Sequence, residues 1–227
     1  MSRKPVIAID GPAASGKSTT ARLVAQRLGY LYIDTGAMYR AAGLKALRLE
    51  IPFSDREAIT KMMDGTDIRQ EPASHGPVTF LDGADVSLLL RSPEISQAAS
   101  DISAITGVRQ RLVKLQQQMG REGGVVMEGR DITTVVFPRA EVKVFMKASV
   151  PERAQRRQAE LELKGIKTDI NEIERQITVR DRQDSQRDDS PLTCTPDSLV
   201  IDTSKLTIDQ QVQMVIDQAE KVRKAQV

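Results

Sequence analysis

The chain of 227 residues is long enough for one substantial hydrophobic core with a small inserted lobe. Its 33 lysines and arginines are nearly balanced by 31 aspartates and glutamates, and only 3% of its residues are aromatic. A general basic field and stacking platforms for bases are both lacking, which argues against a nucleic-acid-binding protein. The sequence has one cysteine and no apolar run of membrane length, so we expect a cytoplasmic protein with no intramolecular disulfide and no membrane partner.

The first predicted unit is a strand, a glycine-rich loop and a helix. Residues 5–9 form an apolar run typical of a strand buried on both faces, and residues 18–28 have apolar positions at helical spacing. Between them, residues 11–18 read GPAASGKS and match the phosphate-binding loop motif G-x-x-x-x-G-K-[ST]. The alternative is a turn that binds nothing, which the matching strand and helix disfavour.

The chemistry of this loop explains its spacing. Backbone N–H groups and the helix N-terminus would surround nucleotide phosphates, Lys17 would reach the outer ones, and Ser18 would hold Mg²⁺. The expected ATP-binding residues of the loop are Gly11, Pro12, Ala13, Ala14, Ser15, Gly16, Lys17, Ser18 and Thr19.

A second strand is predicted at residues 30–33 and a helix from Ala37 to about Leu49. Arg40 lies early in this helix, close to the carboxyl end of the strand, where open α/β sheets bind their ligands. Residues 54–57 read SDRE, a capping box with Ser54 as the N-cap of a helix that extends to about Met63.

Residues 64 to about 91 interrupt the alternation of strands and helices. Asp82-Gly83 separates residues 78–81 from residues 84–87 and is a two-residue signal for an antiparallel hairpin, beside which residues 66–69 would add a third strand. We expect a small antiparallel lobe that closes over a substrate. The alternative is a surface hairpin without function.

The rest of the chain returns to the αβ pattern. Ser92-Pro93 is expected to start a helix over residues 94–105, and a second helix is expected over residues 108–120. The further predicted elements are strands at 124–128, 142–146 and 198–201, helices at 151–164 and from 171, and a last helix from about 207. Five short strands alternating with helices predict an α/β fold with a doubly wound parallel sheet. We expect a core of residues 1–62 and 102–227, a lobe of residues 63–101 and a helical lid at about 152–188.

Arginines are placed where a second phosphate would lie. Arg40 and Arg130 follow the ends of predicted parallel strands, on the same edge as the phosphate-binding loop, and a planar guanidinium suits phosphate recognition. Two predicted helices that meet near Gly165 resemble a lid over a triphosphate, and their arginines include Arg153, Arg156, Arg157, Arg180, Arg182 and Arg187. The alternative for these helices is a solvated face with salt bridges.

A phosphate monoester is the acceptor that these residues favour. Its attacking oxygen is already ionised near neutrality, so transfer to it needs no base, whereas transfer to an alcohol benefits from one. The only histidine, His75, is expected to be an exposed loop residue. Catalysis would then depend on positioning and charge neutralisation by Mg²⁺ and by Lys17, Arg130, Arg156 and Arg157.

Five segments resemble one family closely. Residues 10–18, 34–40, 97–100, 128–138 and 180–184 read DGPAASGKS, DTGAMYR, QAAS, EGRDITTVVFP and RDRQD. From residue 5 to about 220 the chain resembles the bacterial cytidylate kinases, a family of P-loop nucleoside monophosphate kinases. The resemblance implies transfer of the γ-phosphoryl group of ATP to CMP or dCMP with Mg²⁺, by a protein that we expect to be a monomer.

The resemblance also implies the acceptor-binding residues. The family's contacts with the CMP phosphate fall on Thr35, Arg40 and Arg130, those with the sugar on Arg180 and Asp184, and those with cytosine on Ser100, Arg109, Asp131 and Arg187. A carboxylate beside hydroxyl and guanidinium donors complements the amino group, N3 and O2 of cytosine, and an ionised Asp131 would disfavour UMP. Asp10 and Asp34 would either help to place Mg²⁺ or cap backbone N–H groups.

Two alternatives remain. One is another kinase of the same fold, acting on a small metabolite or a different nucleotide. The other is a nucleotide-dependent switch or interaction module, although the sequence contains no Asn-Lys-x-Asp motif for guanine and a switch gives no reason for acceptor-side arginines.

Overall fold

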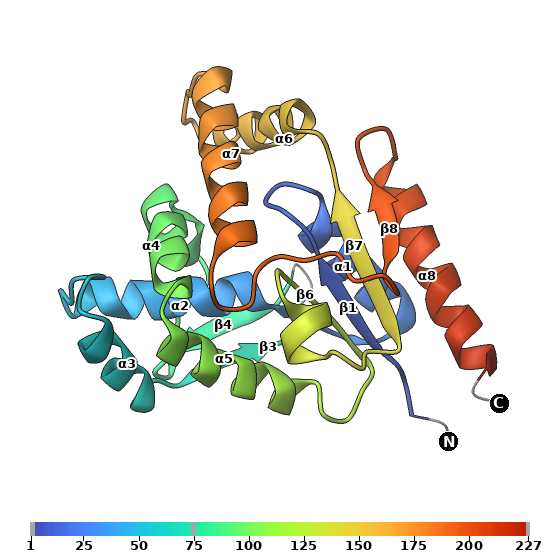
Figure 1. Cartoon of the computed structure of the whole chain (residues 1–227), viewed down its shortest axis with the longest axis horizontal. Helices are drawn as coiled ribbons and strands as arrows, with labels where there is room; N and C mark the ends of the chain where they lie inside the picture. Colours follow the sequence, from blue (N-terminus) through green and yellow to red (C-terminus); the bar gives the residue numbers. More distant parts are fainter. Residues whose placement is uncertain (1–2, 74–75, 226–227) are drawn as a thin grey trace.

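A sheet of five parallel strands forms the centre of the computed structural model, which describes residues 3–73 and 76–225 (Figure 1). In spatial order the strands are β2 (Leu31–Asp34), β6 (Val125–Gly129), β1 (Val6–Asp10), β7 (Val142–Lys147) and β8 (Leu199–Asp202), and every neighbouring pair is parallel. All five residues of β1 are buried, as its apolar sequence predicts. The predicted five-stranded α/β architecture is confirmed.

Helices cover both faces of this sheet. Val6 and Ala8 of β1 point into a core shared with α2 (Thr35–Arg48), α3 (Arg56–Asp64), α4 (Pro93–Ser103) and α5 (Thr106–Met119). Ile7 and Ile9 point into a second core shared with α1 (Lys17–Leu28) and α8 (Ile208–Ala225). Because successive side chains of a strand face opposite sides, one apolar run supplies both cores.

The carboxyl ends of the strands meet at one edge of the sheet. The phosphate-binding loop follows β1, α2 follows β2, a single π-helical turn over Ile132–Val136 follows β6, and α6 (Val150–Glu162) follows β7. The strand order changes direction at β1, whose neighbours β6 and β7 come much later in the chain. A crevice at such a switch point is the usual ligand site of an open α/β sheet.

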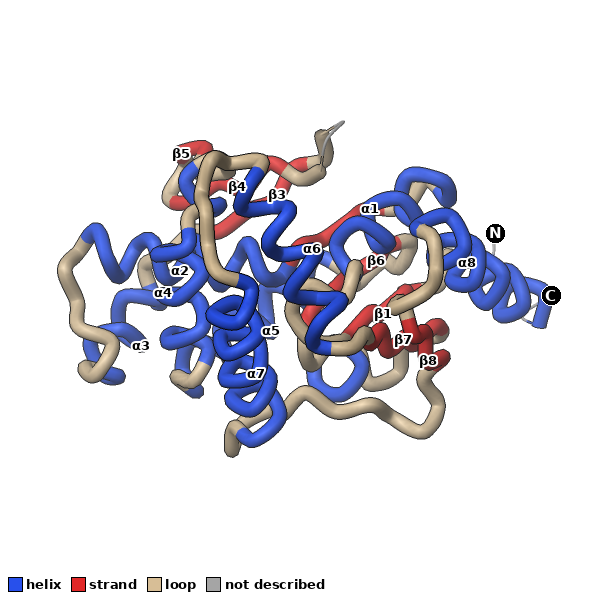
Figure 2. The backbone as a smooth tube through the Cα atoms, turned by 90° about the horizontal axis from the view of Figure 1, so that it is seen from above, coloured by secondary structure: helices blue, strands red, loops and turns tan. Residues whose placement is uncertain are grey.

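A separate three-stranded antiparallel sheet lies beside α2 (Figure 2). Its strands are β3 (Ile68–Glu71), β4 (Val78–Leu81) and β5 (Ala84–Asp85). Asp82 and Gly83 have φ of 49° and 84°, as the predicted two-residue turn requires. The last strand is shorter than expected because the side chain of Ser87 accepts the N–H of Thr79. Where the core ends and the lobe begins stays a prediction.

Two helices extend from the carboxyl edge of the sheet. They are α6 and α7 (Ile170–Gln186), which pack on each other through Ala154, Leu161, Ile173 and Ile177 (Figure 1). Gly165, in the turn between them, has φ of 74° in the left-handed region that glycine adopts readily. These helices occupy the part of the chain that the sequence predicts as a lid.

The predicted cap at Ser54 is wrong by one residue. Asp55 is the N-cap of α3, and its side chain accepts the N–H of Ala58 at 2.9 Å. Adjacent serine and aspartate offer similar oxygens, and the local pattern does not say which one will face the helix.

His75 lies outside the described residues. None of the helices in the described ranges is long and apolar enough to cross a membrane.

Candidate active site at the carboxyl edge of the sheet

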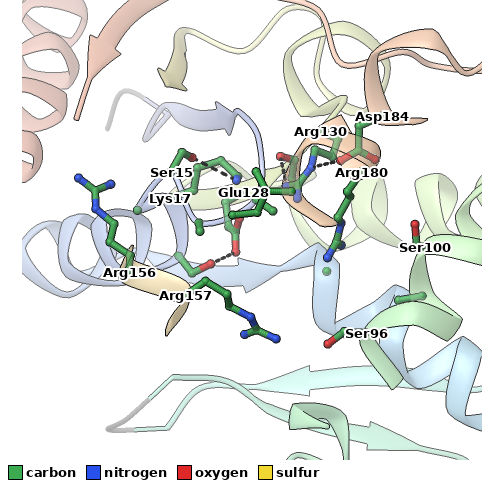
Figure 3. A pocket seen from close by; sticks show the side chains of 18 of the residues that line it. Ser15, Lys17, Ser96, Ser100, Glu128, Arg130, Arg156, Arg157, Arg180 and Asp184 are labelled. Atoms are coloured by element: carbon green, nitrogen blue, oxygen red, sulfur yellow. Dashed lines mark hydrogen bonds and ion pairs between the residues drawn. The ribbon is translucent and has the colours of Figure 1, made fainter. Parts of the chain in front are cut away.

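One cleft of about 1250 Å³ lies at the carboxyl edge of the central sheet (Figure 3). It is lined by the phosphate-binding loop and by residues from α2, α4, α6, α7 and the end of β6. Of the ATP- and acceptor-binding residues predicted from the sequence, all but Gly11 and Pro12 line it. The structure therefore brings together residues that are as far apart in the chain as Ala13 and Arg187.

The phosphate-binding loop packs against β7. A Cβ on Gly11 would lie 2.0 Å from the carbonyl oxygen of Met146, so only glycine fits there. No side chain in the described part of the chain caps α1, which begins at Lys17, so its first N–H groups are available to an anion. The Nζ of Lys17 donates to Pro12 O at 2.7 Å and is close to the Oγ of Ser15. Burial, and then the charge of Arg130, lower the pKa of Lys17 to about 7.

Glu128 is a site residue that the sequence did not reveal. It is 5% exposed at the end of β6 and lines the cleft (Figure 3). Its Oε1 accepts the hydroxyl of Ser18 at 2.7 Å and that of Tyr32 at 3.3 Å. A serine hydroxyl and a carboxylate at the nucleotide phosphates fit Mg²⁺, which prefers oxygen ligands and keeps several waters. An acidic residue at the end of a strand next to β1 is the signal that would have found it.

Asp10 and Asp34 both act as caps. The carboxylate of Asp10 is fully buried and accepts the N–H groups of Ile132 and Thr133 and the hydroxyl of Thr133. Burial outweighs these bonds and raises the pKa of Asp10 to about 6. Asp34 accepts the N–H of Ala37 at 2.9 Å and pairs with Arg40 at 3.0 Å. Of the two alternatives left open by the sequence, these contacts favour capping over metal placement.

Positive charge gathers opposite the phosphate-binding loop. Arg130 donates its Nε to Asp184 at 2.8 Å, whereas the buried Nε of Arg180 has no hydrogen-bond partner among the described residues (Figure 3). Burial, and then the charge of Arg130, lower the pKa of Arg180 to about 10. Arg40 also lines this part of the cleft. These partly buried cations outnumber their carboxylate partners, which favours the binding of an anion here.

The arginines of α6 have different surroundings. Arg156 donates to the hydroxyl and the carbonyl of Thr203, which fixes it beside the loop. Arg157 is half-buried and pairs with Glu160 at 3.1 Å. Arg153 is 3% exposed and does not line the cleft. The alternative prediction, a solvated helix face with salt bridges, therefore fits Arg157 but not the buried Arg153.

The far end of the cleft combines carboxylates with guanidinium nitrogens that lack hydrogen-bond acceptors, and Nε of Arg109 lies 3.8 Å from Oδ1 of Asp189. Asp131 is buried, accepts from Nη2 of Arg109 through Oδ2, and has Oδ1 4.0 Å from Nη2 of Arg187. The Nε of Arg109 and the Nη2 of Arg187 are buried without a hydrogen-bond acceptor among the described residues. Two neighbours were not predicted: Gln183, whose Oε1 is 3.4 Å from the Oγ of Ser100, and the partly buried ring of Tyr39, against which Arg109 lies.

Known proteins of one family resemble this chain over almost its whole length. A family model described as cytidylate kinase matches residues 7–221. The chain is a member of the cytidylate kinase family. A cytidylate kinase of Caldicellulosiruptor bescii is 46% identical over 99% of this chain and 100% of its own length. One of Symbiobacterium thermophilum is 48% identical over 94% and 95% of the two chains.

Other family members carry the same unit within a longer protein. A bifunctional pantoate ligase/cytidylate kinase of a Synechococcus species is 50% identical over 90% of this chain but only 38% of its own length. A solved structure of an uncharacterized protein from Eubacterium ventriosum covers 96% of this chain and 99% of its own, with a TM-score of 0.54 and 12% identity. That last likeness concerns the fold alone.

Proposed function

We propose that this protein is a cytidylate kinase that transfers the γ-phosphoryl group of ATP to CMP and dCMP with Mg²⁺. The observation that carries the proposal is the position of the anion site around Arg130 and Arg180, which faces Lys17 and the phosphate-binding loop within one cleft. A donor phosphate on the loop and an acceptor phosphate on the arginines would meet between them. In-line transfer requires this arrangement and no base, because the acceptor oxygen is already ionised.

Each of the site residues would then have a role in phosphoryl transfer. Lys17 and the loop N–H groups would hold the outer phosphates of ATP, and Arg156 and Arg157 would approach them from α6. Thr35, Arg40 and Arg130 would bind the CMP phosphate, whose charge Arg180 would help to neutralise, and Arg180 and Asp184 would contact the sugar. Mg²⁺, held by Ser18 and Glu128, would neutralise charge that develops on the donor phosphates. The lobe of residues 63–101 and the lid at about 152–188 would close over the two substrates.

A panel of acceptors tests the proposal. Release of ADP is measured with CMP, dCMP, UMP, AMP and a sugar acid, each at several concentrations. We expect kcat/KM to be highest for CMP and dCMP. A higher value for UMP or the sugar acid would overturn the assignment in favour of another kinase. Slow hydrolysis that CMP does not accelerate would favour a nucleotide-dependent switch.

Glu128→Gln is expected to raise the Mg²⁺ concentration for half-maximal activity by about tenfold, because a neutral amide is a weaker partner for the metal and its waters. The measurement is ADP release with CMP across a Mg²⁺ titration. Glu122→Gln changes an exposed carboxylate far from the cleft and is the matched control. An unchanged Mg²⁺ requirement in Glu128→Gln would remove Glu128 from the metal site.

The base end of the cleft suits cytosine. Oδ1 of Asp131 accepts no hydrogen bond in the described structure and would take the exocyclic amino group. The nitrogens of Arg109 and Arg187 that have no hydrogen-bond acceptor match N3 and O2 of the base, with Ser100 as a further donor. UMP offers a carbonyl in place of the amino group, and two acceptors would then face each other.

Asp131→Asn is therefore expected to reduce discrimination between CMP and UMP by at least about tenfold, because an amide can donate to the uracil carbonyl. The kcat/KM values for the two acceptors provide the measurement, and Asp217→Asn, an exposed change on α8 outside the cleft, provides the control. Equal losses for CMP and UMP would remove Asp131 from base recognition.

We further propose that the protein acts as a monomer in the cytoplasm, with ATP, CMP and dCMP as its partners. One chain supplies the donor loop, the acceptor arginines and the base-binding end of the cleft, so a second copy is not needed to complete the site.

A further inference from the structure

We propose that Arg153 is a positioning residue that sets the acceptor-binding face of α7 relative to the phosphate-binding loop. This inference rests on the proposed kinase function. Arg153 lies in the first turn of α6 and is 3% exposed. It does not line the cleft, so it would act on the substrates through other residues.

The guanidinium of Arg153 joins three separate segments. Its Nε donates to Ala148 O at 3.1 Å, at the junction of β7 and α6. Its Nη1 donates to Ala13 O at 3.2 Å, in the phosphate-binding loop. Nη1 and Nη2 also bind both carboxylate oxygens of Asp181 on α7, at 3.0 and 2.5 Å. Four hydrogen bonds in one plane require the fixed fork of arginine, which lysine lacks.

At the loop, Arg153 holds a peptide next to an unusual backbone conformation. Ala14 has φ of 57°, in the left-handed region that residues with a Cβ seldom adopt. The carbonyl that accepts from Arg153 belongs to Ala13, in the peptide bond that joins Ala13 to Ala14. Both alanines line the cleft. The contact therefore helps to keep the tip of the loop in the shape that faces the phosphates.

At α7, Arg153 anchors the residues that would bind the acceptor. Asp181 follows Arg180 directly and lies one helical turn before Asp184, which pairs with Arg130 at 2.8 Å. The helix is thus held at two points, by Arg153 and by Arg130. Arg182, which follows Asp181, is exposed. Its side chain donates only to Gln186, on the same helix, among the described residues.

One side chain therefore links the donor loop to the acceptor helix. If its geometry is lost, the two phosphates still bind but their separation and angle change. A displacement of about 1 Å away from the reacting atoms is enough to lower a rate by about 100-fold. The effect of losing the contact with Asp181 should fall on kcat, because binding of ATP to the loop does not itself need α7.

Arg153→Lys, Asp181→Asn and the double variant test the inference. For each we measure kcat, KM for CMP, the melting temperature and the dissociation constant of a non-hydrolysable ATP analogue without acceptor. We expect Asp181→Asn to lose up to about 100-fold in kcat with a nearly unchanged analogue affinity. Arg153→Lys, which also loses the bond to Ala13 O in the phosphate-binding loop, should lose kcat and bind the analogue more weakly. The double variant should lose no more kcat than the worse single variant, since each single variant already removes the Arg153–Asp181 pair. Arg182→Lys, which changes an exposed arginine next to Asp181 on α7, is the matched control.

Other outcomes would overturn the inference. A wild-type kcat in Arg153→Lys would show that the fork is not required. A lower melting temperature with weaker analogue binding and unchanged kcat would assign Arg153 a structural role, and additive losses would separate it from Asp181. Should Arg153→Lys fail to fold, Asp181→Asn carries the test, because the side chain of Asp181 is 27% exposed. Failure of the kinase proposal is distinguishable, since the wild-type protein would then show no CMP-dependent ADP release.

Discussion

Replacement of Lys17 by methionine is expected to lower kcat/KM by about 10³-fold with CMP and with dCMP alike. The ammonium group is the cation of the phosphate-binding loop, and it is buried at the bottom of the cleft. Methionine keeps the length of the side chain but cannot neutralise charge on the donor phosphates. Because the donor is the same in every reaction, the loss should not depend on the acceptor.

Steady-state ADP release with each acceptor measures this effect. Lys114→Met, which removes an exposed cation from α5, is the matched control and should behave as wild type. A loss confined to one acceptor, or one smaller than about tenfold, would contradict the assignment of Lys17 to the donor phosphates.

The protonation of Lys17 adds a second, independent readout of the same role. In the free protein, burial and then Arg130 lower its pKa to about 7, so the neutral amine predominates at pH 8. Bound phosphates favour the charged form and raise the pKa in the complex. Binding of ATP at pH 8 should therefore take up most of one proton, and affinity should fall as pH rises above 7. Calorimetry in two buffers of different ionisation enthalpy detects the uptake, which Lys17→Met should abolish.

Local sequence patterns were sufficient for most of the fold. The apolar run of β1, the glycine loop and α1 are contiguous, so their order alone predicts strand, loop and helix. Asp82-Gly83 predicted the hairpin because few dipeptides adopt positive φ at both positions. The π-helical turn at Ile132–Val136 was not predicted, because the buried carboxylate of Asp10, which is 122 residues away from Ile132, receives its first N–H groups.

In the candidate site, too, some residues could be predicted from the local sequence and others could not. The loop and the strand-end arginines follow from position along the chain, whereas Glu128 and Arg153 depend on contacts between distant segments. Arg153 and Arg157 lie on one helix in similar local sequence. Only the packing of α7 and the loop buries the first against Asp181 and leaves the second half-exposed beside the cleft. A helix with three arginines cannot by itself say which one binds protein and which faces a substrate.

Arg180→Met is expected to make the free protein more stable and the enzyme much less active. The Arg180 guanidinium is buried beside Arg130, and its pKa is lowered to about 10. A shift of this size corresponds to about 3 kcal/mol against the charged form, which is the form present at neutral pH. Removal of the charge should recover part of that energy and raise the melting temperature by a few degrees, roughly 2–4 °C per kcal/mol recovered.

The same replacement should lower kcat/KM for CMP by about 10²- to 10³-fold, because the acceptor loses a buried cationic partner. CMP should also raise the melting temperature less in Arg180→Met than in the wild-type protein, since the acceptor no longer relieves repulsion between Arg180 and Arg130. Thermal melts with and without CMP, together with ADP release, measure both effects. Arg182→Met, which removes an exposed arginine of α7 that does not line the cleft, is the control. A lower melting temperature in Arg180→Met, or an unchanged response to CMP, would mean that Arg180 stabilises the fold and is not held ready for an anion.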